Sequence, residues 1–494
     1  MAAKWSRPTN QARDERVRCS VEMEIENMSG RIEAEYKRGS QPEGSDWYGS
    51  LISSVVRQAL VLAAVGLAGV SLGAQAADWY VRPNGASYGA ASGKTWTDAF
   101  SGFSAIPWNT VACGDTIWVA GGDYSQDLQP AKKCSSSARL SIRRARSDVP
   151  ATTGAAGWSS NFDTSVHQIN GAGITFNGDW DYITISGRTT SAGGGNGWWI
   201  DLRGRTQGAG IEFANGAGAD FNTMEYMDLQ GPGAITYTGD GRGIDATPFS
   251  SANGNIFSHM RIFDWESAIY HVGINGSTFE YLDVYDIMAA NWSSYHPNGL
   301  YTSDSNNVIV RYSKFRKGPK GYGAGEGIFF EQGGGAANWQ IYGNVFYDLN
   351  QSGWKAIQIT SAVPGLKVFN NTFDNIIVPG IYVNGGSCGT GSESKNNLSY
   401  ATSAPNACGA TSNNLTISSS PMPFVNRAAR DYRIVATTGN GYPRNAGTSI
   451  ANLFTTDIAG VTFGVDGLWD VGAYEYESNV TTSSLSPPVG LTVR

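Results

Sequence analysis

Charged residues are scarce in this chain of 494 residues, at 16%, and only four histidines occur. No stretch of useful length has the period of an amphipathic helix, which argues against a helical bundle. Aromatic residues, in contrast, reach 12%, and there are 63 glycines. A disordered chain would be poor in aromatics, so the composition predicts an all-β protein with many turns.

Basic residues are outnumbered, with 35 Lys and Arg against 42 Asp and Glu and a net charge of −7. An acidic chain binds nucleic acids poorly, so we expect no nucleic-acid partner. The one long apolar stretch without charge lies near the N-terminus, between Gln58 and Ala77. We therefore expect no stable membrane insertion once that stretch has been removed.

The N-terminal stretch has the layout of a secretory signal peptide. Arg57 precedes an apolar run, and Ala74-Gln75-Ala76 follows it as a small-x-small cleavage site. We expect residues 1–50 to be a leader that arises from a start site assigned too early, and residues 51–76 to be the signal. The mature protein would then be secreted, periplasmic or on the cell surface. The alternative is an uncleaved membrane anchor with a cytoplasmic tail.

Five cysteines occur, and CxxC spacings are absent, which argues against a zinc site. Cys113 and Cys134 are 21 residues apart, and Cys388 and Cys408 are 20 apart. In an oxidising compartment each pair can close as a disulfide. Cys19 is left over in the leader.

Two short segments alternate along the chain and repeat. The first has an aliphatic centre, at spacings of 24 to 34 residues; the centres are Ile235, Ile269, Leu300, Ile328, Ile357 and Ile381. The second has apolar residues at alternate positions, the period of a half-buried strand; its copies begin at Phe279, Val310, Ile341 and Val368. Short strands that repeat at uneven spacing predict the coils of a parallel β-solenoid. Asparagines at Asn306-Asn307, Asn370-Asn371 and Asn396-Asn397 suit its corners, because Asn tolerates a left-handed backbone.

The sequence also resembles a known group of proteins. The segments that carry the resemblance are Asp78–Phe100, Cys113–Tyr124, Arg430–Ile434, Thr456–Val461 and Asp470–Tyr476. They are similar to the first coil and the C-terminal cap of secreted bacterial right-handed parallel β-helix proteins of the pectate-lyase-like superfamily. The resemblance implies a single-stranded right-handed parallel β-helix over residues 77–480, with N-terminal and C-terminal caps. Residues 481–494 would be a linker to a further module.

The residue after each aliphatic centre is expected to point outward. That row contains Thr236, Tyr270, Tyr301, Phe329, Gln358 and Tyr382. Aromatic rings in a row suit the C–H faces of sugars, so we expect a polysaccharide to bind here. The alternative is a cluster covered by a long loop. His271 falls at an inward position and is expected to be a core residue.

Five cations lie close together within ten residues: Arg311, Lys314, Arg316, Lys317 and Lys320. Either they form a solvated edge, or they bind the carboxylates of an acidic polysaccharide. In β-elimination of a uronate chain, cations or Ca²⁺ neutralise the carboxylate, a base removes a proton and an acid assists the leaving group. We expect His296 or Lys317 as base, Tyr301 as acid, and Arg316 with Lys320 as carboxylate clamps.

Related lyase-type β-helices carry an Arg-His-Gly-like triplet on the strand after such a coil. Here that strand reads Phe330-Glu331-Gln332-Gly333, without the arginine. Glu326 and Glu331 offer two carboxylates, the requirement for glycoside hydrolysis, but an extended strand separates residues five apart by about 16 Å. Glu331 could instead pair with Asp304 or Glu266 on adjacent coils. Asp and Asn in the turns could bind Ca²⁺, although no loop has the spacing of a calcium site.

Three functions are compatible with these features. The first is a polysaccharide lyase for a uronate-containing chain, the second a glycan-binding or structural surface protein, and the third a glycoside hydrolase. The cations near Tyr301 favour the first, whereas the truncated module favours the second. We expect a monomer that needs no cofactor apart from the Ca²⁺ considered above.

Overall fold

The computed structural model describes residues 76–203, 208–214, 216, 218–233, 241–246, 252–287, 297–331, 333–349, 354–384, 388–406, 408–439 and 441–478. Within these ranges helices are short: η1 (Phe103–Ala105), α3 (Pro150–Thr153), η2 (Ser160–Phe162) and η3 (Arg427–Ala429). None of the helices in the described ranges is long and apolar enough to cross a membrane.

One parallel sheet has eight strands, one from each successive coil. In chain order they are β7 (Ile174–Phe176), β12 (Gly208–Phe213), β14 (Gly241–Ala246), β16 (Ser267–Val272), β19 (Asn298–Ser303), β22 (Glu326–Phe330), β25 (Ile357–Ile359) and β28 (Ile381–Val383).

A larger sheet of 22 strands forms the other two faces of the stack. Its first face contains β1 (Asp78–Arg82), β2 (Phe100–Ser101), β3 (Thr116–Val119), β5 (Leu140–Arg144), β8 (Ile183–Ser186), β17 (Thr278–Glu280), β20 (Ile309–Arg311), β23 (Gln340–Tyr342), β26 (Lys367–Phe369), β29 (Glu393–Lys395) and β31 (Ala410–Ser412). Its second face contains β4 (Gly122–Tyr124), β6 (Val166–Gln168), β11 (Trp198–Asp201), β18 (Asp283–Tyr285), β21 (Lys314–Arg316), β24 (Val345–Tyr347), β27 (Thr372–Asp374), β30 (Leu398–Tyr400) and β32 (Leu415–Ile417). Two longer strands run through both faces, β13 (Thr223–Gln230) and β15 (Ile256–Phe263).

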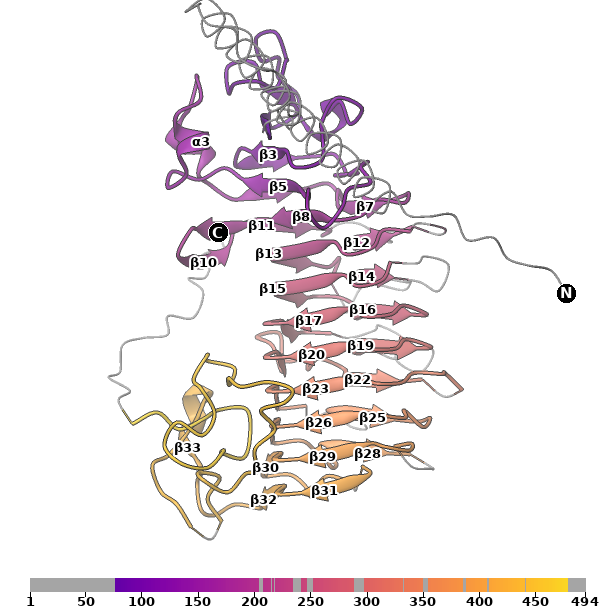
Figure 1. Ribbon diagram of the computed structural model, residues 1–494, viewed down its shortest axis with the longest axis vertical. Helices are drawn as coiled ribbons and strands as arrows, with labels where there is room; N and C mark the ends of the chain where they lie inside the picture. The colour runs from indigo at the N-terminus through magenta and orange to yellow at the C-terminus, as the bar shows by residue number, and fades with distance from the viewer. Residues whose placement is uncertain are drawn as a thin grey trace, which may run out of the picture. The chain divides into compact units, whose positions relative to one another are not determined.

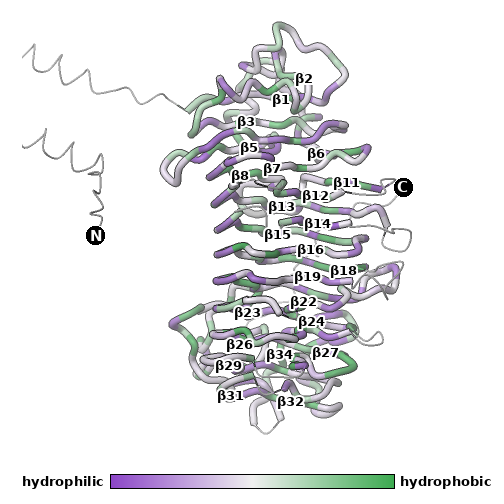
Figure 2. Tube along the Cα trace, turned by 90° about the vertical axis from the view of Figure 1, so that its right-hand side faces the viewer, coloured by the Kyte–Doolittle hydropathy of each residue, from purple (hydrophilic) through white to green (hydrophobic). Residues whose placement is uncertain are grey.

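The described residues therefore form a parallel β-helix, as the repeats predict. Each turn of the chain adds one rung to every face, and the rungs stack from β3 to β32 (Figure 1). Seen from the side, apolar and polar residues intersperse along each rung (Figure 2). Because successive side chains of a strand point to opposite faces of the sheet, apolar side chains can face the interior while polar ones face water.

Interior rows of aliphatic side chains hold the coils together. In the eight-stranded sheet one such row is fully buried and in register; it consists of Ile174, Ile211, Ile244, Ile269, Leu300, Ile328, Ile357 and Ile381. The sequence predicts five of these centres correctly. The sixth, Ile235, lies outside the described residues, and Ile244 occupies the rung before Ile269.

Residues in the left-handed conformation turn the corner between the two faces of the larger sheet. Tyr281 and Tyr312 have φ of 53°, and in later coils Asn370 (49°) and Asn396 (54°) adopt the same conformation. The prediction that asparagines occupy sharp corners is confirmed there. Asn tolerates this region better than most residues because its short side chain can bond to nearby backbone.

Beside this corner, buried asparagines bond to one another from coil to coil. The backbone N–H of Asn344 donates to the Asn371 side chain, that of Asn371 donates to Asn397, and that of Asn397 donates to Asn414. The ladder satisfies backbone groups that the bend removes from the sheets. It fixes the corner of the last four coils.

After β32 the chain turns back along the side of the stack. It forms an antiparallel pair of β33 (Phe424–Asn426) and β34 (Asp431–Ile434), and nearer the N-terminus β9 (Arg188–Thr190) pairs with β10 (Gly193–Asn196). Arg427 bonds to Asp374, and Asn370 donates to the carbonyl of Asp470. These segments lie beside the coils (Figure 1), and the two caps and the other domain limits stay predictions.

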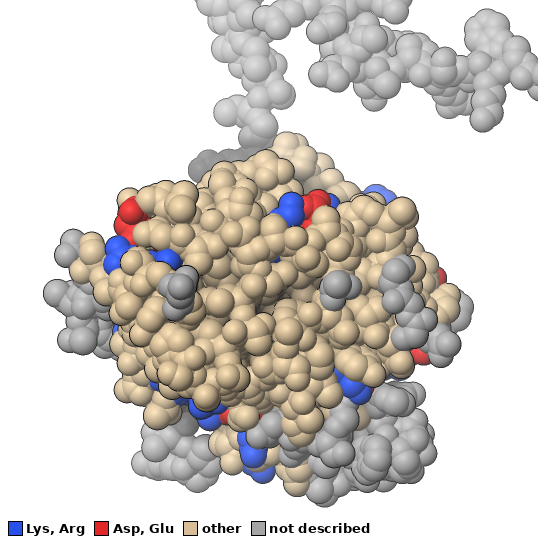
Figure 3. Space-filling view, turned by 90° about the horizontal axis from the view of Figure 1, so that it is seen from below, with Lys and Arg blue, Asp and Glu red and all other residues tan. Residues whose placement is uncertain are grey.

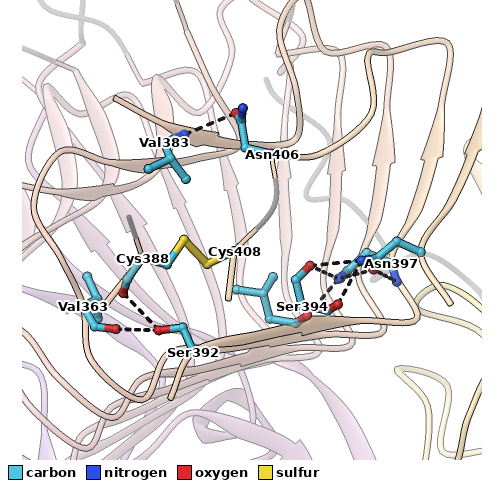
Figure 4. The surroundings of a disulfide bond; sticks show 10 residues. Val363, Val383, Cys388, Ser392, Ser394, Asn397, Asn406 and Cys408 are labelled. Atoms are coloured by element: carbon cyan, nitrogen blue, oxygen red, sulfur yellow. Dashed lines mark hydrogen bonds between the residues drawn. A yellow bond between two sulfur atoms is a disulfide. The ribbon is translucent and has the colours of Figure 1, made fainter. Parts of the chain in front are cut away.

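Both predicted disulfides are present, Cys113–Cys134 and Cys388–Cys408. The second links the segments on either side of β29 and lies inside the stack, where Cys388 and Cys408 are buried (Figure 4). Ser392 hydroxyl bonds to the carbonyls of Cys388 and Val363 beside it. The disulfide therefore ties the connections before and after β29 to each other inside the last coils.

Replacing Cys388 and Cys408 together by Ser is expected to lower the free energy of unfolding by about 3 kcal/mol, because the unfolded chain regains the entropy of the closed loop. Urea denaturation measures the loss. The matched control is the Cys113/Cys134 double Ser variant, whose loop is almost equal in length, 21 residues against 20. Because Cys388 and Cys408 are buried in the core, their removal should cost more than the control. Equal losses would contradict a packing contribution.

Candidate functional site

The outer surface of the eight-stranded sheet carries the row that the sequence predicts. Register places Tyr270, Tyr301, Phe329, Gln358 and Tyr382 opposite one another on successive rungs. Toward the N-terminus the row continues with Asp245, Glu212 and Thr175. Asp245 holds the position predicted for Thr236, which lies outside the described residues.

Three of the aromatic rings in this row contact one another, those of Tyr270, Tyr301 and Phe329. Tyr270 and Tyr301 are parallel, with ring centroids 4.7 Å apart and planes at 2°. The Arg242 guanidinium covers the other face of Tyr270, 3.6 Å from its centroid, and Phe329 is 7% exposed. Both faces of the Tyr270 ring are therefore covered, by Arg242 and Tyr301, and sugar binding by this row stays a prediction.

Tyr301 keeps its proton at neutral pH. Burial raises the pKa of Tyr301 well above its usual value, and the neighbouring Glu331 and Tyr270 add to the rise.

Glu326 is a buried carboxyl group at the start of β22. It is 7% exposed, and its Oε2 atom has no hydrogen-bond partner among the described residues. Burial raises its pKa to about 7; Lys355 opposes the rise and the charge of Glu331 adds to it. Glu331 therefore influences Glu326, although an extended strand would separate the two by about 16 Å along its rise. A carboxyl group with this pKa can give a proton at neutral pH.

A second buried acceptor lies on the same surface. Gln358 is 8% exposed, and its Oε1 atom likewise lacks a partner within the described part of the chain. Buried polar atoms are costly when unpaired, and both atoms here are acceptors.

Among the described residues around this row, carboxylates outnumber cations. The acidic groups are Glu212, Asp245, Glu326 and Glu331, and the basic groups are Arg242 and Lys355. Arg242 is bound to Asp245, with 3.0 Å between Nη1 and Oδ2, and Lys355 lies over the Tyr382 ring. The surface therefore suits a neutral glycan better than a polyanion.

The predicted cationic cluster lies elsewhere. Lys314 and Arg316 belong to β21 of the larger sheet, and Arg316 Nε lies 2.6 Å from Asp283 Oδ1 on the previous coil. Lys320 Nζ lies 2.8 Å from Asp264 Oδ1, and Arg311 pairs with Glu280. These three cations balance acidic residues of neighbouring coils, so the structure does not place Arg316 in the row of Tyr301.

The remaining predicted positions have different outcomes. Lys317 follows β21 and is exposed, and its role as a base stays a prediction. His296 lies outside the described residues. His271 is buried, and its Nε2 atom lies 2.9 Å from the Ser277 hydroxyl, which confirms it as a core residue. Arg242 and Asp245 were not predicted as part of the site, although their segment Gly-Arg-Gly-Ile-Asp contains the same kind of aliphatic centre, Ile244.

Three carboxylates come close together in the C-terminal segment, Asp466, Asp470 and Glu475, with oxygens within 4.8 Å of one another. Protein groups already bind them: the backbone N–H groups of Gly464 and Asp470 donate to Glu475, and Arg444 pairs with Asp466. Burial and the neighbouring Asp470 raise the pKa of Glu475 to about 8. Calcium binding by this protein stays a prediction.

The raised pKa makes stability depend on pH. The folded state holds a proton on Glu475 that the unfolded state releases above about pH 4.5, so stability should fall as pH rises from there to about 8. We expect lower stability at alkaline than at acidic pH within this window. Urea denaturation at the two ends of the window measures the difference, and Glu475→Gln should reduce it without abolishing it, because burial also raises the pKa of Glu326. A variant with an unchanged difference would contradict the assignment.

Comparison with known proteins completes this description. No known family's sequence profile matches the chain, and none of the curated proteins matches it. Among solved structures it is similar to pectate lyase Pel9A, at 15% identity and a TM-score of 0.47, over 83% of this chain and 98% of that one. It is also similar to XylC in complex with xylose (11%, TM-score 0.42, 68% of this chain and 70% of that one). An alginate lyase from Paenibacillus sp. str. FPU-7 matches at 13%, with a TM-score of 0.34, over 63% of this chain and 91% of that one.

Proposed function

We propose that the outer row of the eight-stranded sheet binds a neutral polysaccharide and that Glu326 and Glu331 hydrolyse one of its glycosidic bonds. The observation that carries the proposal is Glu326, a buried carboxyl group with an unpaired oxygen and a pKa of about 7, which a second carboxylate influences. An environment of this kind is how a protein keeps a carboxylic acid protonated for acid catalysis.

In this mechanism Glu326 donates its proton to the glycosidic oxygen as the bond to the sugar breaks. Glu331 takes a proton from a water molecule, and the water oxygen forms the new bond to the sugar carbon. This mechanism needs the two carboxyl groups about 6.5–9.5 Å apart, the spacing of inverting enzymes, which is closer than a fully extended strand would place them.

Export supports this function. The two disulfides are typical of proteins outside the cytoplasm, where polysaccharides are met. We propose that the protein acts there after removal of the signal segment predicted at residues 51–76.

Incubation with neutral glucans, xylan, pectate, alginate and hyaluronan tests the reaction. Hydrolysis predicts new reducing ends from a neutral polymer without the ultraviolet absorbance of unsaturated uronates. Absorbance together with cleavage would establish β-elimination, the lyase function expected from the sequence, and would overturn hydrolysis. Binding without cleavage would establish a glycan-binding protein and would also overturn it. The anomeric configuration of the first product tests inversion.

A further inference from the structure

The last coil ends in strands that pair on one side only. Among the described residues, β31 pairs with β29 and β32 pairs with β30, and neither has a neighbour beyond. Thr411 and Thr416 continue the interior rows of the buried Ser394 and Ser399. Both threonines are nevertheless exposed, so the stack of coils is open at this end.

This end also carries no charge. Between Lys395 and Arg427 the sequence contains no charged residue. Viewed from this end, the molecule shows a broad surface of uncharged residues, with acidic and basic groups toward its rim (Figure 3). Proteins usually protect an unpaired edge with lysines or other charges, and β31 and β32 have none.

Toward the end of the stack the side chains of the interior rows change from apolar to hydroxyl-bearing. One row passes from Val368 through Ser394 to Thr411, and the other from Phe373 through Ser399 to Thr416. Hydroxyl groups therefore replace apolar side chains where the rows become exposed. The open end is polar enough for water, yet among the described residues no strand pairs with the outer side of β31 or β32.

We propose that a second copy of this chain binds this end, with the edge strands of the two copies pairing about a two-fold axis. In a two-fold interface the same surface of both copies is in contact. A charged surface would therefore repel its copy, whereas this neutral surface does not. A highly charged partner, in contrast, would gain no attraction here. The strands would meet antiparallel, and threonines would lie across from threonines, a favourable cross-strand pair.

This arrangement closes after one contact and gives a dimer, whereas the sequence analysis predicts a monomer. Each copy keeps its outer row free, because the row lies along the eight-stranded sheet and the pairing uses the end of the stack. The inference is therefore independent of the proposed function.

Sedimentation velocity across a hundredfold range of protein concentration tests the proposal, and we expect a dimer at the upper end. The double variant Thr411→Lys/Thr416→Lys places like charges across the axis and should raise the dissociation constant about 100-fold. At a concentration where both proteins are monomeric its thermal midpoint should be unchanged, since both side chains are exposed. The control is Thr153→Lys in α3, an exposed threonine in the first part of the fold.

Three results would overturn the proposal. They are a monomer at every concentration, a dimer that persists in the double variant, and a ladder of higher oligomers, which would indicate an open head-to-tail contact. Weakening of the dimer by Thr153→Lys to the same extent would exclude this surface as well.

Discussion

Glu326→Gln is expected to lower kcat on a cleaved polysaccharide by about 1,000-fold, because the amide cannot give a proton to the leaving oxygen. The substitution preserves shape in a side chain that is 7% exposed. Initial rates of reducing-end formation measure the effect. Glu225→Gln, on β13 of the larger sheet, is the matched control and should keep full activity.

The pH dependence of the same reaction tests the role of Glu326 directly. An acid must be protonated, so the rate should fall as pH rises through about 7. Lys355 lowers the pKa of Glu326, and Lys355→Met should therefore move the fall in rate to higher pH. A pH profile that this change leaves in place would remove Glu326 as the acid.

Stability provides a readout that does not need a substrate. Above pH 7 the folded protein carries a buried charge on Glu326, which costs free energy that the unfolded state does not pay. Glu326→Gln removes that charge and should raise stability by about 2 kcal/mol at alkaline pH, with little change below pH 5. A loss of both activity and stability would instead indicate a structural role.

The architecture could be predicted because it depends on period and composition. In a strand, the residues after Ile269, Leu300 and Ile328 must point outward if these three point inward. The outer row could therefore be predicted from the sequence alone. Cys388 and Cys408 lie within one local stretch, which made their pairing the simplest choice. Asparagine at the left-handed corners could be predicted because tolerance of a positive φ is a property of the single residue.

Contacts between coils could not be predicted. Arg316 looks unpaired in the sequence, and its partner Asp283 lies 33 residues away on the previous coil. Register also decides that Arg242 and Tyr301 cover the two faces of Tyr270. The coils vary in length from 24 to 34 residues. Partners on neighbouring coils are therefore separated by no fixed number of residues, and the sequence does not show which residues pair.

The pair Glu326 and Glu331 shows the same limit within one strand. Rise alone places them about 16 Å apart, and the sequence argument therefore treated them as a poor pair. Burial and local geometry decide whether one charge influences the other. Only the fold shows that Glu326 is buried with an unpaired oxygen.

Asn371→Ala is expected to lower the free energy of unfolding by about 4 kcal/mol, the largest stability effect that we anticipate, since each buried polar group left unpaired costs about 1–3 kcal/mol. The Asn371 side chain accepts from the N–H of Asn344 and donates to the carbonyls of Ile341 and Phe369. The substitution leaves all three backbone groups without this partner inside a corner where Asn371 is fully buried.

Asn414→Ala is the matched control, because Asn414 is the last member of the same ladder and is partly exposed at the open end. Water can replace its bonds to Asn397, so its loss should cost about 1 kcal/mol. Urea denaturation of both variants measures the difference. Similar costs at the two positions would mean that burial does not set the strength of the ladder, and that the corner is held by packing of the apolar rows.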